Sequence, residues 1–272
     1  MRLVLFTDLD GTLLDHEDYS WEAAEPALAS LHDHEVPVVM VTSKTRAEVE
    51  QLRPRLGNEA PFITENGGGV FFPRVCGPVE SADAVQVDGY STVVLGRPYT
   101  EARSFIEARL SRYAIEGFGD MSQQRIAELT GLTLHDARLA ARREFTEPFL
   151  LEPKSDLERL ELEAAEEDFA ITTGGRFFHL IGQRQDKGRA VELVAQFYRG
   201  QFEEEISTVG LGDSANDLSM LRVVDLPVVI PRVSGERLEL SDRQPTFASQ
   251  PGSRGWNEAV TAILARVYSA ES

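Results

Sequence analysis

The fold of this chain is indicated most clearly by residues near its start, Leu3-Val4-Leu5-Phe6-Thr7-Asp8-Leu9-Asp10-Gly11-Thr12. An apolar run of strand length ends in two acids separated by one residue, and then Gly and Thr follow. Apolar residues without alternation are typical of a parallel strand buried on both faces. Open α/β sheets bind ligands where such strands end. We therefore expect Asp8 and Asp10 at the mouth of a crevice.

The spacing of the two acids also indicates which reactions they could support. Two carboxylates this close repel one another unless a cation neutralises them, which indicates a hard metal ion, most simply Mg²⁺. One carboxylate can then serve as a nucleophile and the other as a general acid and base. The alternative is a helix N-cap, where Asp and Thr are also common. The rest of the chain has to separate the two interpretations.

Composition limits the classes of function. The chain has 272 residues, enough for two domains, and 42% of them are hydrophobic, enough for a buried core. A net charge of −18 argues against nucleic acid as a partner. No apolar stretch approaches the roughly 20 residues that span a bilayer, so no membrane partner is expected. The single cysteine, Cys76, excludes internal disulfides, and we expect a cytoplasmic protein.

Strand and helix patterns alternate in both terminal parts of the chain, which predicts a parallel sheet with right-handed crossovers. The expected strands are Leu3–Phe6, Val36–Val41, Phe62–Thr64, Ile206–Leu211 and Pro227–Ile230, and the expected helices are Trp21–His32, Ala47–Leu56, Lys187–Tyr198, Ser214–Arg222 and Ala259–Val267.

The middle of the chain has a different texture. Strand-like pieces (Thr92–Leu95, Phe145–Leu151, Ala170–Thr173 and Phe177–Ile181) mix with charged helices such as Asp156–Glu167. The pattern predicts an α+β cap domain, residues 84–182, inserted into a Rossmann-like α/β core formed by residues 1–83 and 183–272. The Glu-rich run Glu158–Asp168 is interpreted as a solvated face.

Two further segments place polar residues beside predicted strand or helix ends. Thr42 follows the strand Val36–Val41, where its hydroxyl can donate to a phosphate oxygen. Thr45 begins a capping-box pattern with Glu48, so a purely structural role for the segment is the alternative. Lys187 opens a helix, where a cation opposes the helix dipole, and this placement suggests a partner such as an aspartate or phosphate. The alternative is a plain surface lysine.

The fourth segment is Val209-Gly210-Leu211-Gly212-Asp213-Ser214-Ala215-Asn216-Asp217. An apolar strand again ends in an acid, with a helix following. Asp213 can complete a metal site with Asp8 across adjacent strand ends. Asn216 and Asp217, in the first helical turn, would orient Lys187 or a water on the metal. Taken alone, the segment is also compatible with an ordinary strand–helix turn.

Together the four segments resemble the haloacid dehalogenase superfamily of phosphotransferases. The resemblance covers the whole predicted core and accounts for an inserted cap. It implies that Asp8 attacks phosphorus to form an aspartyl-phosphate, and that Asp10 protonates the leaving alcohol and later activates water. It also implies that Mg²⁺ is held by Asp8, the Asp10 main-chain carbonyl and Asp213, with Asp217 as a further candidate ligand.

The resemblance implies that Thr42 and Lys187 hold the transferring phosphoryl oxygens. We expect the cap to select the substrate. Arg143 and Arg176 bring cations into an acidic chain, and arginine suits carboxylate recognition. Gly174 and Gly175 would allow close backbone approach to a ligand. An ordinary turn with solvated arginines is the alternative.

These cap segments, with those containing Ser43, Lys44, Glu65, Asn66 and Gly67, resemble the mannosyl-3-phosphoglycerate phosphatase subfamily, whose product is the compatible solute mannosylglycerate. With Asn216, these residues and the cap residues above are the predicted substrate contacts. The resemblance implies a phosphorylated glycosyl glycerate as substrate. Glucosyl-3-phosphoglycerate, a broader set of sugar phosphates, or a phosphomutase reaction remain alternatives, and a non-catalytic binding module is the alternative of another class.

Overall fold

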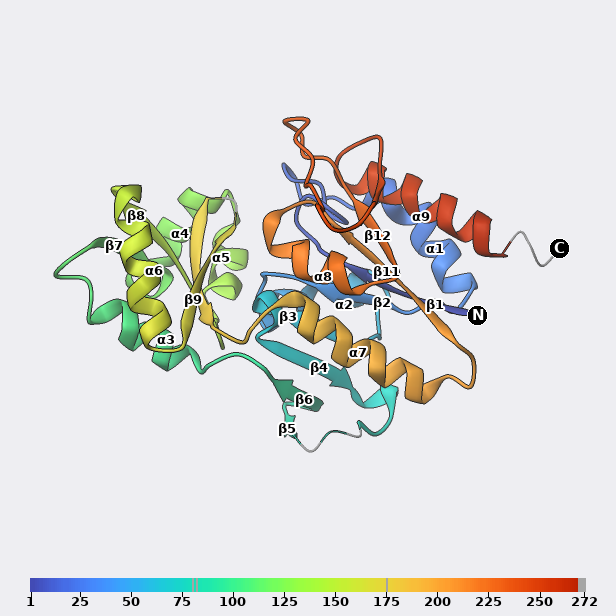
Figure 1. The fold of residues 1–272 in the computed structure, drawn as a ribbon, viewed down its shortest axis with the longest axis horizontal. Helices are drawn as coiled ribbons and strands as arrows, with labels where there is room; N and C mark the ends of the chain where they lie inside the picture. The colour runs from blue at the N-terminus through green and yellow to red at the C-terminus, as the bar shows by residue number, and fades with distance from the viewer. Residues whose placement is uncertain (80, 82, 175, 269–272) are drawn as a thin grey trace. The chain divides into compact units, whose positions relative to one another are not determined.

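The computed structural model describes residues 1–79, 81, 83–174 and 176–268. The chain forms two compact units (Figure 1). The first contains Met1–Thr42, Ala60–Phe62 and Lys187–Ser272, and the second contains Ser43–Glu59 and Ile63–Asp186. The predicted cap, residues 84–182, lies within the second unit. This unit is larger than the predicted cap because it also contains residues that precede residue 84. The division at 84–182 stays a prediction.

The first unit is built on a parallel sheet in the order β13-β12-β11-β1-β2. Its central strand β1 is buried on both faces, as an apolar run without alternation requires. The fold class predicted from the sequence is therefore found here. The strands are β1 (Arg2–Thr7), β2 (Val38–Val41), β11 (Ile206–Gly212), β12 (Leu226–Val229) and β13 (Thr246–Phe247).

Helices pack along the strands of this sheet, and α1 contacts α9 while α7 contacts α8 (Figure 1). Trp256 of α9 is fully buried and donates from Nε1 to the Thr7 hydroxyl, 3.0 Å away, just before Asp8. The helices, including short 3₁₀ turns, are η1 (Glu22–Ala24), α1 (Glu25–Asp33), α7 (Lys187–Gln201), η6 (Ala215–Asp217), α8 (Leu218–Val223) and α9 (Gly252–Tyr268).

The second unit contains antiparallel sheets. β4, β6 and β5 are antiparallel neighbours in that spatial order, with β6 between the other two, and a four-stranded sheet has the order β7-β8-β10-β9. The strands are β4 (Gly69–Pro73), β5 (Ala84–Val87), β6 (Tyr90–Val94), β7 (Ala114–Gly117), β8 (Glu147–Glu152), β9 (Phe169–Gly174) and β10 (Phe177–Gly182). Strand β3 (Phe62–Thr64) carries the chain from the first unit into the second.

Helices α3 (Tyr99–Glu107) and α6 (Leu157–Glu166) pack on the four-stranded sheet through an apolar cluster that includes Phe105, Phe149 and Leu160. The predicted solvated face is confirmed in part, because α6 buries only Leu160 and Ala164. The helices and 3₁₀ turns are α2 (Arg46–Arg55), η2 (Glu65–Gly67), η3 (Arg74–Cys76), α3 (Tyr99–Glu107), η4 (Phe118–Asp120), α4 (Gln123–Thr130), α5 (Leu134–Ala140), η5 (Lys154–Asp156) and α6 (Leu157–Glu166).

Some boundaries differ from the expected ones for identifiable reasons. Strand β8 begins at Glu147 instead of Phe145, because the amides of Phe145 and Thr146 donate to the Glu65 carboxylate instead of joining the sheet. The expected helix Ser214–Arg222 begins as the 3₁₀ turn η6 before α8. Among the described residues, no helix combines the length and apolarity needed to cross a bilayer.

Candidate active site

The carboxyl edge of the parallel sheet gathers the candidate residues of the first unit. Asp8 follows β1, and its amide donates to the Leu211 carbonyl of β11 at 2.9 Å. The parallel register pairs Thr7 with Leu211 on one side and with Met40 on the other. Thr42, which is buried, comes just after β2 at this same edge. The structure therefore places the ends of β1, β2 and β11 together, as the sequence predicted.

Lys187 is the first residue of α7 and is fully buried. Its Nζ donates to Asp8 Oδ1 at 2.6 Å and to Asp217 Oδ1 at 2.7 Å. The Gly188 amide, next in the helix, donates to the Ser219 hydroxyl at 3.1 Å. The surface-lysine alternative is thereby excluded, and the unfavourable position at the helix start is offset by two carboxylate partners.

Asp217 stabilises the turn that follows β11. Its Oδ2 accepts the amides of Asp213 and Ser214, each at 3.1 Å. The turn needs the preceding glycine, because a Cβ on Gly212 would lie 2.5 Å from Asp217 Cβ. One Asp217 oxygen accepts a hydrogen bond from Lys187 and the other accepts from backbone amides, so this side chain has a structural role.

The loop after β1 brings Asp10 and its neighbours toward Asp213. Gly11 has a φ of +81°, a conformation that side chains disfavour, and a Cβ there would lie 3.2 Å from Asp213 Oδ2. The Thr12 hydroxyl donates to Asp213 Oδ1 at 3.4 Å. Asp10 itself forms an isolated bridge with Leu14, which closes the loop. Thr12 is a member of the site that the sequence analysis did not single out.

Burial and crowding raise the pKa of the carboxyl groups at this edge. Burial, followed by the charge of Asp217, raises the pKa of Asp8 well above its usual value, although Lys187 opposes the shift. The same two causes raise the pKa of Asp213 to about 6. Burial alone would lower the pKa of Lys187, but the charges of Asp217 and Asp8 outweigh it and raise that pKa. Lys187 therefore stays protonated, and its charge only partly offsets the burial and crowding that raise the pKa of the two carboxyl groups.

Asp8, Asp213 and Asp217 each offer a carboxylate oxygen within 4.8 Å of the others. Carboxylate oxygens are the donors that hard divalent cations prefer. A cation here would offset the repulsion that raises the pKa of Asp8 and Asp213. The residues thus fit a metal ion. Both Asp217 oxygens already accept hydrogen bonds, from Lys187 and from backbone amides, so a direct contact of Asp217 with the metal stays a prediction.

Several predicted substrate contacts lie in the second unit. Glu65 is fully buried there. Its carboxylate accepts from the amides of Glu144 at 2.8 Å, Phe145 at 3.1 Å and Thr146 at 2.8 Å, and from the Thr146 hydroxyl at 2.8 Å. Arg143 Nε lies 3.3 Å from the same carboxylate. These contacts give Glu65 a structural role in the unit, and a contact with substrate stays a prediction.

Arg143 is also buried and engaged. Its guanidinium donates to the Ser43 carbonyl at 3.1 Å and to the Thr146 hydroxyl. Arg46 forms a second ion pair with this segment, in which its Nε and Nη2 donate to the Glu144 carboxylate at 2.9–3.2 Å. The segment 143–146 is therefore attached to the start of α2 by these hydrogen bonds and ion pairs, and Arg143 contributes to this attachment.

The remaining predicted contacts are distributed as follows. Lys44 Nζ lies 3.6 Å from Glu48 Oε1, and the predicted capping box of Thr45 and Glu48 is confirmed. Asn66 has left-handed backbone angles and is buried. Gly67 ends η2, with a φ of +90°.

The tip of the β9–β10 hairpin carries further predicted contacts. Gly174 ends β9, and Gly175 lies outside the described residues. Arg176 is exposed beside this turn and donates to the Leu129 carbonyl. In the first unit, Asn216 lies in η6 and accepts from the Ser214 hydroxyl.

Comparison with known proteins decides the family. The sequence pattern of the haloacid dehalogenase-like hydrolases matches residues 5–244. The chain belongs to this family. The predicted superfamily is confirmed, and the chain is accordingly a hydrolase by family.

Two curated relatives match nearly the whole chain, and both carry the name glucosyl-3-phosphoglycerate/mannosyl-3-phosphoglycerate phosphatase. The protein of Persephonella marina is 47% identical over 96% of this chain and 97% of its own length. The protein of Methanococcoides burtonii is 38% identical over 98% of each chain.

Solved structures agree on the fold. A Thermoplasma acidophilum protein has a TM-score of 0.68 and 20% identity, over 98% of each chain. The sucrose-phosphatase of Synechocystis, solved with sucrose and phosphate, has a TM-score of 0.64 and 16% identity, over 97% of this chain and 98% of its own. The predicted α/β fold class is confirmed.

Proposed function

We propose that this hydrolase removes the phosphate group of a glycosyl-3-phosphoglycerate through an aspartyl-phosphate on Asp8. The observation that carries the proposal is the contact of Asp8 Oδ1 with the buried ammonium of Lys187 at 2.6 Å. A carboxylate aimed from a strand end and oriented by a fixed cation is suited to nucleophilic attack on phosphorus. Both curated relatives are named as phosphatases of this substrate class.

In the first step an Asp8 oxygen forms a bond to phosphorus, and the bond from phosphorus to the glycerate oxygen breaks. Asp10, two residues further along the same loop, donates a proton to that leaving oxygen. In the second step Asp10 takes a proton from water, whose oxygen attacks the aspartyl-phosphate and frees Asp8 and inorganic phosphate. One residue then serves as general acid and base in turn.

Charge at the phosphoryl group is offset by the residues of the same edge. The Lys187 ammonium, already held by Asp8 and Asp217, can donate to a phosphoryl oxygen, and so can the Thr42 hydroxyl. Asp8, Asp213 and the Asp10 main-chain carbonyl would hold Mg²⁺. When bound, Mg²⁺ supplies charge compensation for the nucleophile and the phosphoryl oxygens.

Within this substrate class, mannosyl-3-phosphoglycerate is the substrate that the sequence resemblance favours. Glucosyl-3-phosphoglycerate is the second candidate, because the names of both relatives include it. The two differ in the orientation of one hydroxyl group, so the same catalytic edge serves either. We assign selection between them to the second unit.

The test measures phosphate release from mannosyl-3-phosphoglycerate, glucosyl-3-phosphoglycerate and simple hexose phosphates, with Mg²⁺ and with EDTA. We expect the glycosyl-3-phosphoglycerates to be preferred, and EDTA to abolish release. Asp8→Asn should abolish turnover and the capture of beryllium fluoride, whereas Asp10→Asn should slow turnover about 10²–10⁴-fold. Normal turnover in Asp8→Asn would refute the mechanism, and a preference for hexose phosphates would refute only the substrate.

A further inference from the structure

An arginine stands beside the acidic edge, one strand further along the sheet. Strand β12 runs parallel to β11, and Val229 pairs with Gly212. The residues after β12 therefore emerge at the same edge as Asp213. Arg232 is the third residue after this strand, and its Nε lies 3.7 Å from Asp213 Oδ2.

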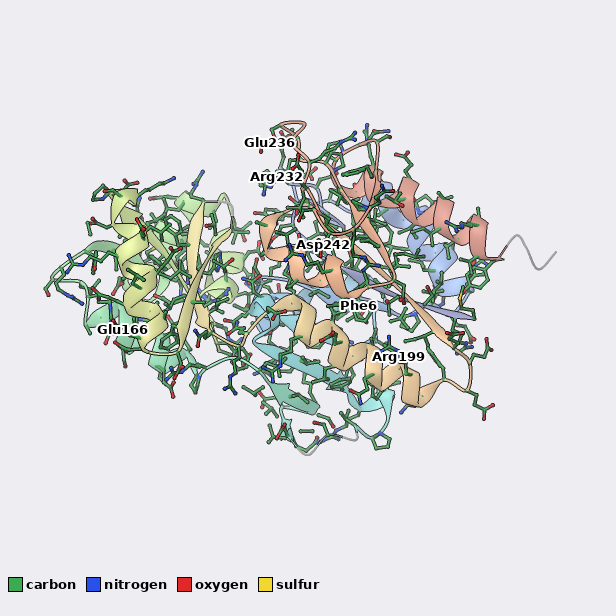
Figure 2. All side chains as sticks on the ribbon, viewed as in Figure 1. Phe6, Glu166, Arg199, Arg232, Glu236 and Asp242 are labelled. Carbon is green, nitrogen blue, oxygen red and sulfur yellow. The ribbon has the colours of Figure 1, made fainter. Side chains whose placement is uncertain are left out.

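The loop holds Arg232 by its backbone. The Arg232 amide donates to the Glu236 carbonyl at 2.9 Å, and the Gly235 amide donates to the Arg232 carbonyl at 2.8 Å. Arg232 Nη1 lies 3.6 Å from the Glu236 carboxylate, and the two side chains lie on this loop in Figure 2. The Arg232 side chain is 43% exposed, against 12% for Asp213. Its main chain is thus held by hydrogen bonds, while its side chain is partly open to solvent.

The charges at the edge are divided between two cations. The Lys187 ammonium binds Asp8 and Asp217. Asp213 is paired with Arg232 instead, at a distance typical of a loose ion pair. A divalent cation held by Asp213 would occupy the same carboxylate and repel the guanidinium. An ion pair 3.7 Å long, whose arginine is open to solvent, is also weak enough to be exchanged for a metal ion.

We propose that Arg232 is an exchangeable cation of the active site. It pairs with Asp213 while the metal is absent, is displaced when a divalent cation binds, and then binds an anionic group of the substrate at the same edge. The inference rests on the proposed function, because it requires both a metal and a phosphorylated ligand there. Arginine suits this second task, since its planar guanidinium matches phosphate and carboxylate oxygens.

The proposal predicts two changes of opposite sign in Arg232→Gln, both measured by isothermal titration calorimetry on the full chain. Without phosphate, Mg²⁺ should bind about two- to fivefold more tightly, the scale of an exposed ion pair removed as competitor. With saturating Mg²⁺, inorganic phosphate should bind about tenfold more weakly, because a charge-assisted hydrogen bond is lost. Arg232→Lys keeps the charge and should lie between wild type and Arg232→Gln.

Arg222→Gln is the matched control. Arg222 Nε lies 3.4 Å from Asp242 Oδ1, and both side chains are about half exposed, 47% and 53%. The control removes the same charge from an exposed pair of the first unit, so neither affinity should change. Unchanged or weaker Mg²⁺ binding in Arg232→Gln would overturn the exchange, and unchanged phosphate binding would overturn the substrate role. Failure of the wild-type chain to bind Mg²⁺ and phosphate would instead count against the proposed function.

Discussion

Lys187 Nζ lies 2.7 Å from Asp217 Oδ1, and both side chains are fully buried. The second Asp217 oxygen accepts two backbone amides of the turn that contains Asp213. Asp217 therefore connects the cation of the site to the turn that presents a candidate metal ligand. These contacts give Asp217 a positioning role, and its direct contact with a metal stays a prediction.

The first prediction concerns these contacts of Asp217. Asp217→Asn removes the charge that holds Lys187 and should lower kcat by about 10²-fold, the scale for losing one preorganised electrostatic contact. The buried ammonium also loses a partner, so we expect the free energy of unfolding to fall by about 3–5 kcal/mol. Steady-state kinetics and urea unfolding measure the two effects.

Asp225→Asn is a suitable control for the first prediction. Asp225 accepts from the amide and hydroxyl of Thr208, at 2.8 and 2.7 Å, in the same unit. It should lose stability with little change in kcat. Equal kcat values for Asp217→Asn and wild type would show that Lys187 does not need this carboxylate.

The second prediction is a pH dependence set by Asp213. The pKa of Asp213 is raised from its ordinary value of 3.8 to about 6, first by burial and then by the charge of Asp217. The folded chain therefore binds this proton more readily than the unfolded chain. The stability gained from protonation is complete below about pH 4 and is lost as the pH rises through 6.

Metal binding should show the opposite trend, because a carboxylate ligand must be ionised. Mg²⁺ affinity should fall as the pH drops below about 6, measured by calorimetry from pH 5 to 8. Metal-free Asp213→Asn should lack this contribution to the pH dependence of unfolding. Mg²⁺ affinity that stays constant from pH 8 to pH 5 would remove Asp213 from the metal site.

The parallel part of the fold was predictable because its signals are local. The apolar run before Asp8 and the one before Asp213 each end in an acid, and parallel strands bring their carboxyl ends to one edge. Lys187 was predictable from its unfavourable place at a helix start. The placement of these residues at one edge of the sheet thus followed from their positions along the chain.

The other members of the site gave no such signal. Thr12 reaches Asp213 only because Gly11 turns the loop back, and Arg232 reaches it across the pairing of β11 with β12. Arg143 suggested a substrate contact because a cation is scarce in an acidic chain. In the structure its guanidinium contacts the Ser43 carbonyl and Glu65, about 100 and 80 residues away in sequence, which spacing cannot reveal, and its contact with substrate stays a prediction.

The third prediction concerns the pairing of Glu65 with Arg143. Glu65→Gln replaces a carboxylate that accepts three backbone amides and a hydroxyl, and it leaves Arg143 without its charge partner. We expect a loss of about 3–5 kcal/mol in the free energy of unfolding, the range for breaking a buried pair. Arg143→Lys should cost less, because an ammonium group keeps the charge but not the fork of donors.

Urea unfolding of the two variants gives the comparison, with Glu116→Gln as control. Glu116 pairs with Arg125 at 3.1 Å on the surface of the same unit, where an ion pair is worth about 0–1 kcal/mol. A Glu65→Gln chain as stable as the control would contradict the structural role and favour a direct contact of Glu65 with substrate.

The last prediction concerns Arg176, which is exposed beside the β9–β10 turn and donates to the Leu129 carbonyl. If its guanidinium binds the glycerate carboxylate, Arg176→Ala should lower kcat/KM for a glycosyl-3-phosphoglycerate by about tenfold or more. This is the effect expected from losing one charge-assisted hydrogen bond. The loss should be far smaller for p-nitrophenyl phosphate, which has no carboxylate. Arg125→Ala removes another exposed arginine of the second unit and should leave kcat/KM for both substrates unchanged. Equal losses on both substrates in Arg176→Ala would mean that this arginine supports the turn through Leu129. A loss confined to the glycosyl-3-phosphoglycerate would assign carboxylate recognition to the second unit, because a purely structural defect has no means of distinguishing two esters hydrolysed at one catalytic edge.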